Sequence, residues 1–433
     1  MIVKLKDLAD IVLSNVDKKS KENEISVKLC NFTDVYKNWA ITEEVSADFM
    51  HATATQSEID KFLLHKGYVA ITKDSETRDD IGVATYIADD FSNTILGYHC
   101  ALIKPNQEKL DGKYLSALLH SPLAQKYFEN NASGSGQRYT LTVDIIGNLP
   151  VPVIDIEKQK HIGDLLSNLD RKVVNNNKII SELESMAKTI YDYWFLQFDF
   201  PDENGKPYKS SGGKMVWNEE LKREIPEGWE VKELGELFET NRGVSYSSAT
   251  LSDSGTPMIN LATFTPKGGY NHNGLKFYSG EYNDDKVIHP YDLVMCNTQQ
   301  TAIDFSKDII GRVFLVPDIF DGDIVSSHHV NSIKVFDDNL KYYLCYLFNS
   351  DFFHKYISGY TNGTNILGLV FSGVEKYRCE IPPKKLLEKF ANIVISAEKE
   401  KSKIIKENQE LASLRDWLLP MLMNGQVTFK DEK

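Results

Sequence analysis

Side chains that pair well with the edges of nucleobases gather in a few loop segments of this sequence. Arginine can donate two hydrogen bonds to guanine, and asparagine or glutamine can exchange two with adenine. The segments are DVYKNW, TKDSETRDD and SGSGQRYT in the first half of the chain, and CNTQQTA and TNGTNI in the second. The candidate DNA-contacting residues are Tyr36, Lys37, Asn38, Lys73, Ser75, Thr77, Arg78, Ser135, Gln137, Arg138, Asn297, Thr298, Gln299, Gln300, Thr301, Asn362, Thr364 and Asn365.

The sequence lacks the motifs that would make this chain a catalyst by itself. It contains no NPPY or DPPY tetrapeptide of an adenine methyltransferase, and no glycine-rich turn after a strand that could hold S-adenosylmethionine. Ser211 to Lys214 lacks the GxxxxGK(S/T) spacing of a phosphate-binding loop. His328 and His329 are adjacent in a β-like run, so their side chains should point to opposite faces and play structural roles. We expect no catalytic residue, no metal site and no cofactor on this chain.

The candidate loops recur because the chain is an internal repeat. A shift of about 230 positions places IGVATYI over IGRVFLV and KYLSALLHSPLAQKYF over YYLCYLFNSDFFHKYI. The same shift places Gly134 on Gly363 and Pro152 on Pro382, and a long helix-like stretch follows each proline. A chance overlap of apolar patterns would not keep this order and spacing from end to end. The chain therefore consists of two copies of one unit, a globular part followed by a helix.

Both helix-like stretches carry apolar residues at alternating steps of four and three, which is the heptad pattern of a coiled coil. About 35 residues of helix would form a rod of roughly 50 Å. Asn176 interrupts the first pattern and could fix the register of the pairing. The alternative is a plain buried helix within a larger core. The predicted helix-seam residues are Ile162, Leu166, Leu169, Val173, Asn176, Ile180, Leu183, Ile190, Phe390, Ile393, Ile404, Leu411, Leu414 and Leu418.

Ahead of each helix, short β-rich runs alternate with turn clusters and an amphipathic helix, which indicates an α+β fold. We expect two similar globular domains separated by two long helices that pack as an antiparallel coiled coil, with pseudo-two-fold symmetry. The expected boundaries are 1–155 for the first domain, 156–198 for the first helix, 199–218 for a linker, 219–383 for the second domain, 384–425 for the second helix and 426–433 for a tail.

Composition places the chain among soluble globular proteins, with 42% hydrophobic and 26% charged residues. No apolar run approaches the roughly 18 residues of a membrane span, and the first residues lack the features of a secretory signal. The five cysteines are odd in number and form no CxxC pair, which favours a reducing cytoplasm. The net charge of −13 makes attraction to phosphate a poor source of DNA affinity.

Residues 199 to 246 resemble the junction between the two halves of type I restriction-modification specificity subunits. In that family a helix runs through a polar link into PxGWxxxxLGE, and this chain has Pro226, Gly228, Trp229, Leu234 and Gly235 at those places. The first helix also shows the family's P…Q…I…L…LD pattern, whereas the second copy departs from it at two points. The residues of that pattern are Pro152, Gln159, Ile162, Leu166 and Asp170, and the departures are Glu388 with Lys389 for the glutamine and Glu400 for the aspartate.

The resemblance implies a non-catalytic subunit with two target-recognition domains, each of which reads one half of an asymmetric, bipartite double-stranded DNA target. It also implies that the helices space the domains and dock modification (methyltransferase) subunits, two of them, and restriction (endonuclease and translocase) subunits. S-adenosylmethionine would then bind to the modification subunits. Because both globular parts are acidic, we expect weak DNA binding by the chain alone. Two alternatives stay open here: a coiled-coil scaffold without DNA contact, and a DNA-modifying enzyme with its own active site.

Overall fold

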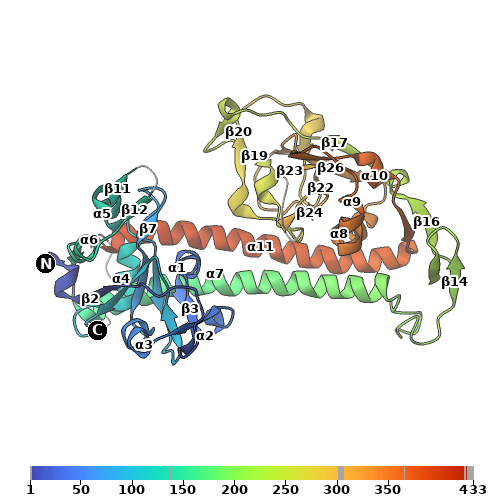
Figure 1. The fold of residues 1–433 in the computed structure, drawn as a ribbon. Coiled ribbons are helices and arrows are strands. Elements are labelled where there is room, and N and C mark those ends of the chain that lie inside the picture. The colour runs from blue at the N-terminus through green and yellow to red at the C-terminus, as the bar shows by residue number, and fades with distance from the viewer. Residues whose placement is uncertain (1, 136–137, 301–306, 365, 424–425, 427–433) are drawn as a thin grey trace, which may run out of the picture. The chain divides into compact units, whose positions relative to one another are not determined.

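The computed structural model describes residues 2–135, 138–300, 307–364, 366–423 and 426. It divides into two compact units, residues 1–175 with 408–433, and residues 176–407. Each unit contains one globular domain and a part of both long helices, α7 (Ile156–Tyr191) and α11 (Lys384–Met423) (Figure 1). Within the described parts of the chain, no helix is both long and apolar enough to cross a membrane.

The domain of the first unit is built on a mixed sheet with the strand order β2-β10-β6-β8-β4, beside a three-stranded sheet β5-β3-β9, a pair β1-β13 and a small sheet β11-β12-β7. Its strands are β1 (Ile2–Lys4), β2 (Ala9–Leu13), β3 (Ile25–Cys30), β4 (Ala40–Ile41), β5 (Met50–Ala54), β6 (Val69–Thr72), β7 (Asp74–Ser75), β8 (Ala84–Ile87), β9 (Thr94–Leu96), β10 (Cys100–Pro105), β11 (Ser133–Ser135), β12 (Arg138–Thr140) and β13 (Pro150–Pro152). Its short helices are η1 (Leu5–Asp7), α1 (Phe32–Lys37), α2 (Glu43–Ser46), α3 (Gln56–Phe62), α4 (Gly112–Leu119), α5 (Pro122–Asn131) and α6 (Val143–Gly147).

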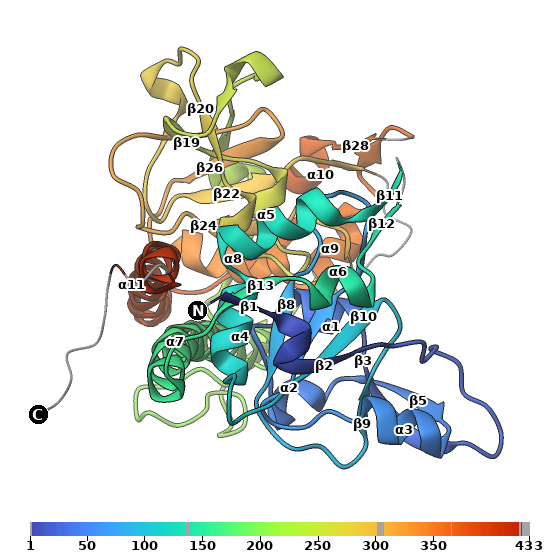
Figure 2. The same cartoon turned by 90° about the vertical axis from the view of Figure 1, so that its left-hand side faces the viewer.

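Local signals explain how the helices of this domain begin. Asp111 caps α4 by accepting a hydrogen bond from the Tyr114 amide (2.9 Å), and Ser121 caps α5, whose first residue is a proline. α4 lies beside the start of α7, where the Lys113 ammonium contacts the Asp164 carboxylate at 2.6 Å (Figure 2). α4 and α7 both bury their apolar faces in the core of the first unit.

The domain of the second unit repeats this plan with the sheet β17-β26-β22-β24, a second sheet β18-β20-β19-β25-β21, the pairs β16-β29 and β14-β15, and a small sheet β23-β28-β27. Its strands are β14 (Met215–Asn218), β15 (Arg223–Pro226), β16 (Glu230–Glu233), β17 (Phe238–Arg242), β18 (Leu251–Ser252), β19 (Thr256–Ile259), β20 (Lys276–Tyr278), β21 (Val287–Ile288), β22 (Leu293–Cys296), β23 (Thr298–Gln300), β24 (Val313–Leu315), β25 (Ile324–Ser326), β26 (Val330–Val335), β27 (Thr361–Asn362), β28 (Ile366–Leu369) and β29 (Arg378–Ile381). Its helical segments are η2 (Asp192–Leu196), η3 (Leu234–Glu236), η4 (Ser248–Thr250), η5 (Leu261–Thr263), η6 (His272–Gly274), η7 (Asp284–Lys286), α8 (Leu340–Asn349), α9 (Asp351–Ile357) and α10 (Phe371–Glu375).

The two domains share their topology, which confirms the predicted α+β class and the predicted duplication. β2-β10-β6-β8 matches β17-β26-β22-β24, and β1-β13 matches β16-β29. A parallel pair also recurs, β3 with β9 and β19 with β25. Gly82 and Gly311, which the repeat aligns, both have positive φ. Their backbone amides donate to the carbonyls of Thr72, the last residue of β6, and Cys296, the last residue of β22.

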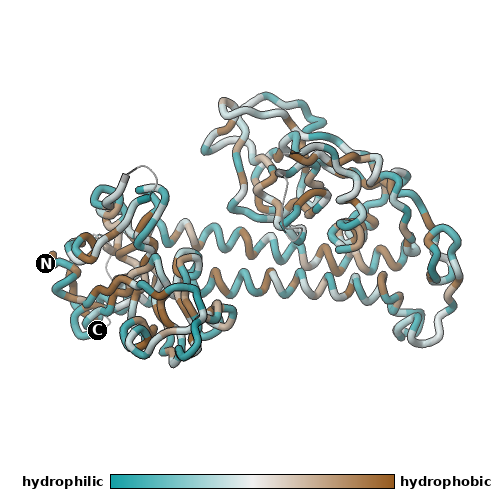
Figure 3. The backbone as a smooth tube through the Cα atoms, in the orientation of Figure 1, coloured by the Kyte–Doolittle hydropathy of each residue, from teal (hydrophilic) through white to brown (hydrophobic). Residues whose placement is uncertain are grey.

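Parts of the two long helices lie along each other in both units, and hydrophobic positions recur along both (Figure 3). In the second unit the Asn176 amide donates to the Glu407 carboxylate at 2.7 Å, and the Lys401 ammonium contacts Glu184 at 2.8 Å. Residue numbers rise along α7 as they fall along α11, so these two segments run antiparallel. Burial alone would lower the pKa of Lys401, but Glu398 and Glu184 raise it above the usual range, so this half-buried ammonium stays charged.

An ion pair joins the helix parts of the first unit as well. The Arg415 guanidinium lies 3.1 Å from the buried carboxylate of Asp170. Burial raises the pKa of Asp170 to about 6, although Arg415 opposes that shift. Arg415 is therefore partly exposed, whereas burial makes ionisation of the Asp170 carboxylate less favourable.

Most of the predicted helix-seam residues are buried or half-buried, but Leu414 is 43% exposed, and its assignment to the seam is wrong. Arg415 occupies the inward position instead, and the apolar contacts continue at Leu419 and Leu422. A straight helix has 3.6 residues per turn, so its buried face drifts away from a strict seven-residue repeat. The buried seam residues are Ile162, Leu166, Asn176, Phe390 and Ile404, and the half-buried ones are Leu169, Val173, Ile180, Leu183, Ile190, Ile393, Leu411 and Leu418.

The segment between the two copies is folded rather than extended. The Asp199 carboxylate accepts hydrogen bonds from the backbone amide and the hydroxyl of Ser210, at 2.7 and 2.6 Å. The ring of Phe200 stacks on both Tyr208 and Trp229, with centroids 4.6 and 5.5 Å apart. The polar linker is thus packed against the second domain.

Candidate nucleic-acid interface

The small sheet β11-β12-β7 brings together two of the loop segments predicted to contact DNA in the first domain. β12 pairs with β7 through Tyr139 opposite Ser75 and Thr140 opposite Asp74, and with β11 through Arg138 opposite Ser135. Segments that are far apart in the sequence therefore form one surface.

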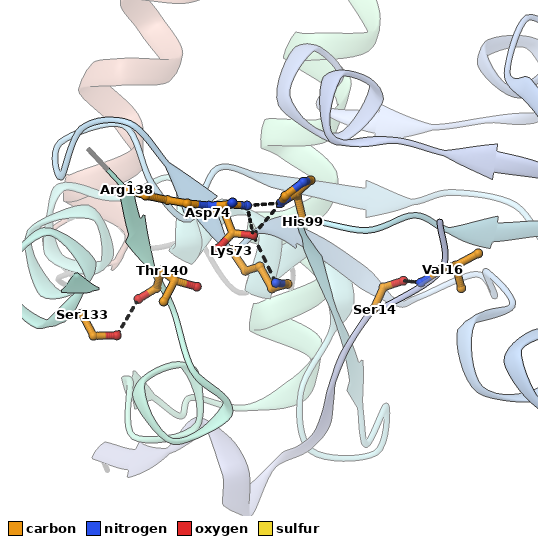
Figure 4. Close-up of polar contacts among 8 residues, drawn as sticks. All are labelled: Ser14, Val16, Lys73, Asp74, His99, Ser133, Arg138 and Thr140. Atoms are coloured by element: carbon orange, nitrogen blue, oxygen red, sulfur yellow. Dashed lines mark hydrogen bonds and ion pairs between the residues drawn. The ribbon is translucent and has the colours of Figure 1, made fainter. Parts of the chain in front are cut away.

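Asp74 is the centre of a polar cluster on this sheet (Figure 4). One of its carboxylate oxygens lies 3.1 Å from the Lys73 ammonium, 2.7 Å from Nδ1 of His99 and 3.4 Å from Nη2 of Arg138. Burial alone would raise the pKa of Asp74, but hydrogen bonds from Thr140, His99 and Lys73 hold it below its usual value. The carboxylate is therefore ionised and organises three basic groups that come from three different segments.

Aromatic rings flank Lys73 of this cluster and the nearby Arg78. The Lys73 ammonium lies 4.8 Å from the ring centre of Tyr98, and the Arg78 guanidinium lies 4.9 Å from that of Tyr139. The Tyr36 hydroxyl lies 3.0 Å from both carboxylate oxygens of Asp80. Interleaved aromatic and cationic side chains suit stacking and phosphate contact with nucleic acid.

The other predicted residues of the first domain occupy different environments. Lys37, Thr77 and Arg78 are exposed, whereas Ser75 is half-buried and accepts a hydrogen bond from the Thr77 amide at 3.2 Å. The Asn38 side chain donates to the Asp34 carbonyl at 2.8 Å at the end of α1. Lys73 is buried, so the structure places it beneath the surface as a support for Asp74.

The small sheet β23-β28-β27 joins the two predicted loop segments of the second domain in the same way. Thr298 and Asn362 both pair with Gly368 of β28. The Asn297 amide donates to the His329 carbonyl at 3.0 Å, as the Lys73 amide donates to that of His99 at 2.9 Å. Both domains thus attach this sheet to the main sheet through the same backbone contacts.

Equivalent glycines close the hairpins of the two small sheets. Gly134 has φ +128° and Gly363 has φ +118°, a region that side chains rarely adopt. A Cβ atom at Gly134 would lie 2.2 Å from the Arg138 carbonyl oxygen, and one at Gly363 would lie 2.0 Å from that of Ile366. Only glycine lets the two hairpin strands approach this closely.

Two of the amide side chains that were predicted to contact DNA in the second domain are buried and form hydrogen bonds inside the domain. The Gln299 carbonyl oxygen accepts a hydrogen bond from the Ile309 amide at 2.7 Å. The side-chain amide nitrogen of Asn297 donates to the His328 carbonyl at 3.3 Å and to the side chain of Asn331. The side-chain oxygen of Asn297 accepts a hydrogen bond from the Thr298 hydroxyl at 2.6 Å.

The remaining predicted residues of the two domains lie on the hairpins or outside what the structure describes. Asn362 and Thr364 are exposed on the hairpin between β27 and β28. Gln137, Thr301 and Asn365 lie outside the described residues, and for Ser135 and Gln300 only the strand position is described.

His328 and His329 lie in the turn between β25 and β26, and their ring centres are 3.8 Å apart. The prediction that they point to opposite faces is wrong, because the alternation of a strand does not apply in a turn. Burial, together with His328 and Arg242, lowers the pKa of His329. His329 is the counterpart of His99, a residue that sequence reasoning missed although YHC lies over HHV in the repeat.

Comparison with known proteins decides the family. The profile of the type I restriction modification DNA specificity domain matches residues 1–185 and 226–411. The chain belongs to this family. Its relatives include the type I restriction enzyme MjaIX specificity subunit of Methanocaldococcus jannaschii, 25% identical over 74% of this chain and 70% of that protein. Another is the HindI specificity subunit of Haemophilus influenzae, 24% identical over 82% of this chain and 85% of that protein.

A solved structure supports the fold assignment. The crystal structure of a type I restriction-modification system S subunit from M. genitalium matches 100% of this chain and 96% of that chain, with a TM-score of 0.55 and 16% identity. This likeness confirms the predicted fold, and the two domain matches confirm the predicted family and role of a specificity subunit. In the described residues, no group of three or more His, Cys, Asp or Glu side chains could hold a metal ion.

Proposed function

We propose that this specificity subunit reads an asymmetric, bipartite target in double-stranded DNA. The sheet β11-β12-β7 would read one half-site, and the sheet β23-β28-β27 would read the other. The observation that carries the proposal is the recurrence of one small sheet at one topological position with different side chains in each domain. A shared frame with different side chains is what two unlike half-sites require.

Catalysis is assigned to partner chains in this proposal. The two long helices would set the spacing between the domains and dock two modification subunits, which would bind S-adenosylmethionine, while restriction subunits would cleave. All five cysteines of this chain are free and buried, which suits a reducing cytoplasm.

The net charge of the chain supports a division of DNA binding between this chain and its partner subunits. A net charge of −13 opposes long-range attraction to phosphate, so the isolated subunit should bind DNA weakly. Partner subunits would hold the duplex, and the small sheets would discriminate between bases. Nanomolar, sequence-specific binding by the isolated chain would contradict this division.

The test is to co-express the chain with its modification subunits and map the methylated bases of the host genome. The expected result is one motif with two unlike halves and a fixed spacer, and its loss when this chain alone is left out. A motif that persists without the chain would support the scaffold alternative. Methyl transfer by the purified chain would support the enzyme alternative.

A further inference from the structure

The two small sheets place unlike side chains at one equivalent position. The Leu141 amide donates to the Lys73 carbonyl at 2.7 Å, and the Leu369 amide donates to the Asn297 carbonyl at 2.8 Å, so these pairs correspond. Arg138 precedes Leu141 by three residues, and Ile366 precedes Leu369 by three residues, so Arg138 and Ile366 also correspond. Both begin the returning strand of their hairpin.

Contact with Asp74 positions Arg138 and leaves N–H donors of its guanidinium unused. Its Nη2 atom lies 3.4 Å from the Asp74 carboxylate, and its side chain is 58% exposed. A guanidinium has five N–H donors in a planar fork, so donors remain for a ligand. An arginine held by a carboxylate loses less freedom on binding than an unanchored one.

Among the residues that the structure describes, the surroundings of Ile366 differ from those of Arg138. Its side chain is 59% exposed, and Thr298 and Asn297 stand where the first domain has Asp74 and Lys73. The second domain therefore offers an apolar contact at the place where the first offers a cation. In the major groove, arginine pairs with O6 and N7 of guanine, while apolar side chains contact the methyl group of thymine.

We propose that Arg138 reads a guanine in one half-site and that Ile366 reads the methyl group of a thymine in the other. This inference rests on the proposed function and deepens it. Asp74 is a positioning residue, since it acts through Arg138.

The test uses the assembled methyltransferase complex and its mapped target duplex. Each guanine is replaced in turn by 7-deazaguanine, which lacks the N7 acceptor, and each thymine by uracil, which lacks the methyl group. One 7-deazaguanine should weaken binding by about tenfold, as expected for loss of a specific contact to guanine. One uracil in the other half-site should weaken binding by about fourfold, as expected for one methyl group.

The variants Arg138→Ala and Ile366→Ala connect these losses to the residues. The Arg138→Ala complex should lose no further affinity at the 7-deazaguanine position that weakens the wild type, and uracil should still weaken its binding. The Ile366→Ala complex should lose no further affinity with uracil, and 7-deazaguanine should still weaken its binding. Lys126→Ala and Phe336→Ala remove side chains of the same kinds that are also exposed, and they should respond as the wild type does.

The outcomes separate the inference from the proposed function. If the wild-type complex shows no sequence preference, the proposed function fails. If it reads a bipartite target but both variants keep the full analogue effects, the inference is overturned and the proposed function stands. Loss of complex assembly in Ile366→Ala, with an unchanged target, would show that Ile366 serves a protein contact and would also overturn its role here.

Discussion

Replacing Gly363 by alanine should disrupt the reading hairpin of the second domain without unfolding the domain. Both Gly363 and Gly322 have positive φ, at +118° and +90°, so alanine carries a backbone strain of about 1–2 kcal/mol at either position. A Cβ at Gly322 meets nothing within 4 Å, whereas one at Gly363 would lie 2.0 Å from a backbone carbonyl oxygen. Since real Cβ contacts stay beyond 3.0 Å, β27 and β28 must separate by at least 1.0 Å.

Hydrogen exchange measures this separation directly. The Val370 amide donates to the Tyr360 carbonyl at 2.9 Å, where the β27–β28 pair ends, so it should lose protection in Gly363→Ala and keep it in Gly322→Ala. Both variants should lower the unfolding midpoint by a few degrees, about 2–4 °C per kcal/mol for a unit of this size. In the assembled complex, Gly363→Ala should relax one half of the methylated motif only. Equal protection of the Val370 amide in the two variants would show that alanine at Gly363 does not separate the strands.

Two further predictions concern the packing of the long helices. Asp170 has a folded-state pKa of about 6, above the value of about 4 in an unfolded chain, so the stability it contributes is fully present below pH 4 and is lost as the pH rises through 6. Relative to Asp170→Asn, the wild type should therefore lose about 2 kcal/mol between pH 4 and 7 in denaturant titrations. A constant difference would show that the carboxylate is not desolvated. Phe390 is fully buried against Tyr191 and Phe195, so Phe390→Ala should lower the free energy of unfolding of the second unit by about 3–5 kcal/mol in the same titrations. A decrease below about 1 kcal/mol would mean that Phe390 does not anchor α11 in this core.

Much of the architecture could be predicted because the repeat and the apolar periodicities are local properties of the sequence. The equivalence of Gly134 and Gly363 was visible in the aligned copies, and both glycines do close a hairpin by close approach of two strands. The heptad pattern also located the buried faces of both long helices, except at Leu414, where Arg415 turns inward to meet Asp170.

The candidate site was harder to predict, because it depends on contacts between distant segments. Nothing local shows that Asp74 pairs with Thr140, or that this pairing brings His99 and Arg138 to one carboxylate. Burial of polar side chains is equally invisible in a sequence. Gln299 therefore appeared available for base contact, although it accepts a backbone hydrogen bond inside the domain.

Under the proposed function, each globular domain of this chain reads one half of the target independently of the other. The most direct test replaces the first globular domain, up to the start of α7, with a second copy of residues 219–383, and maps the methylated motif of the resulting complex. The expected target has two identical, inverted half-sites, both equal to one half of the wild-type motif. A motif that keeps the original first half would contradict it.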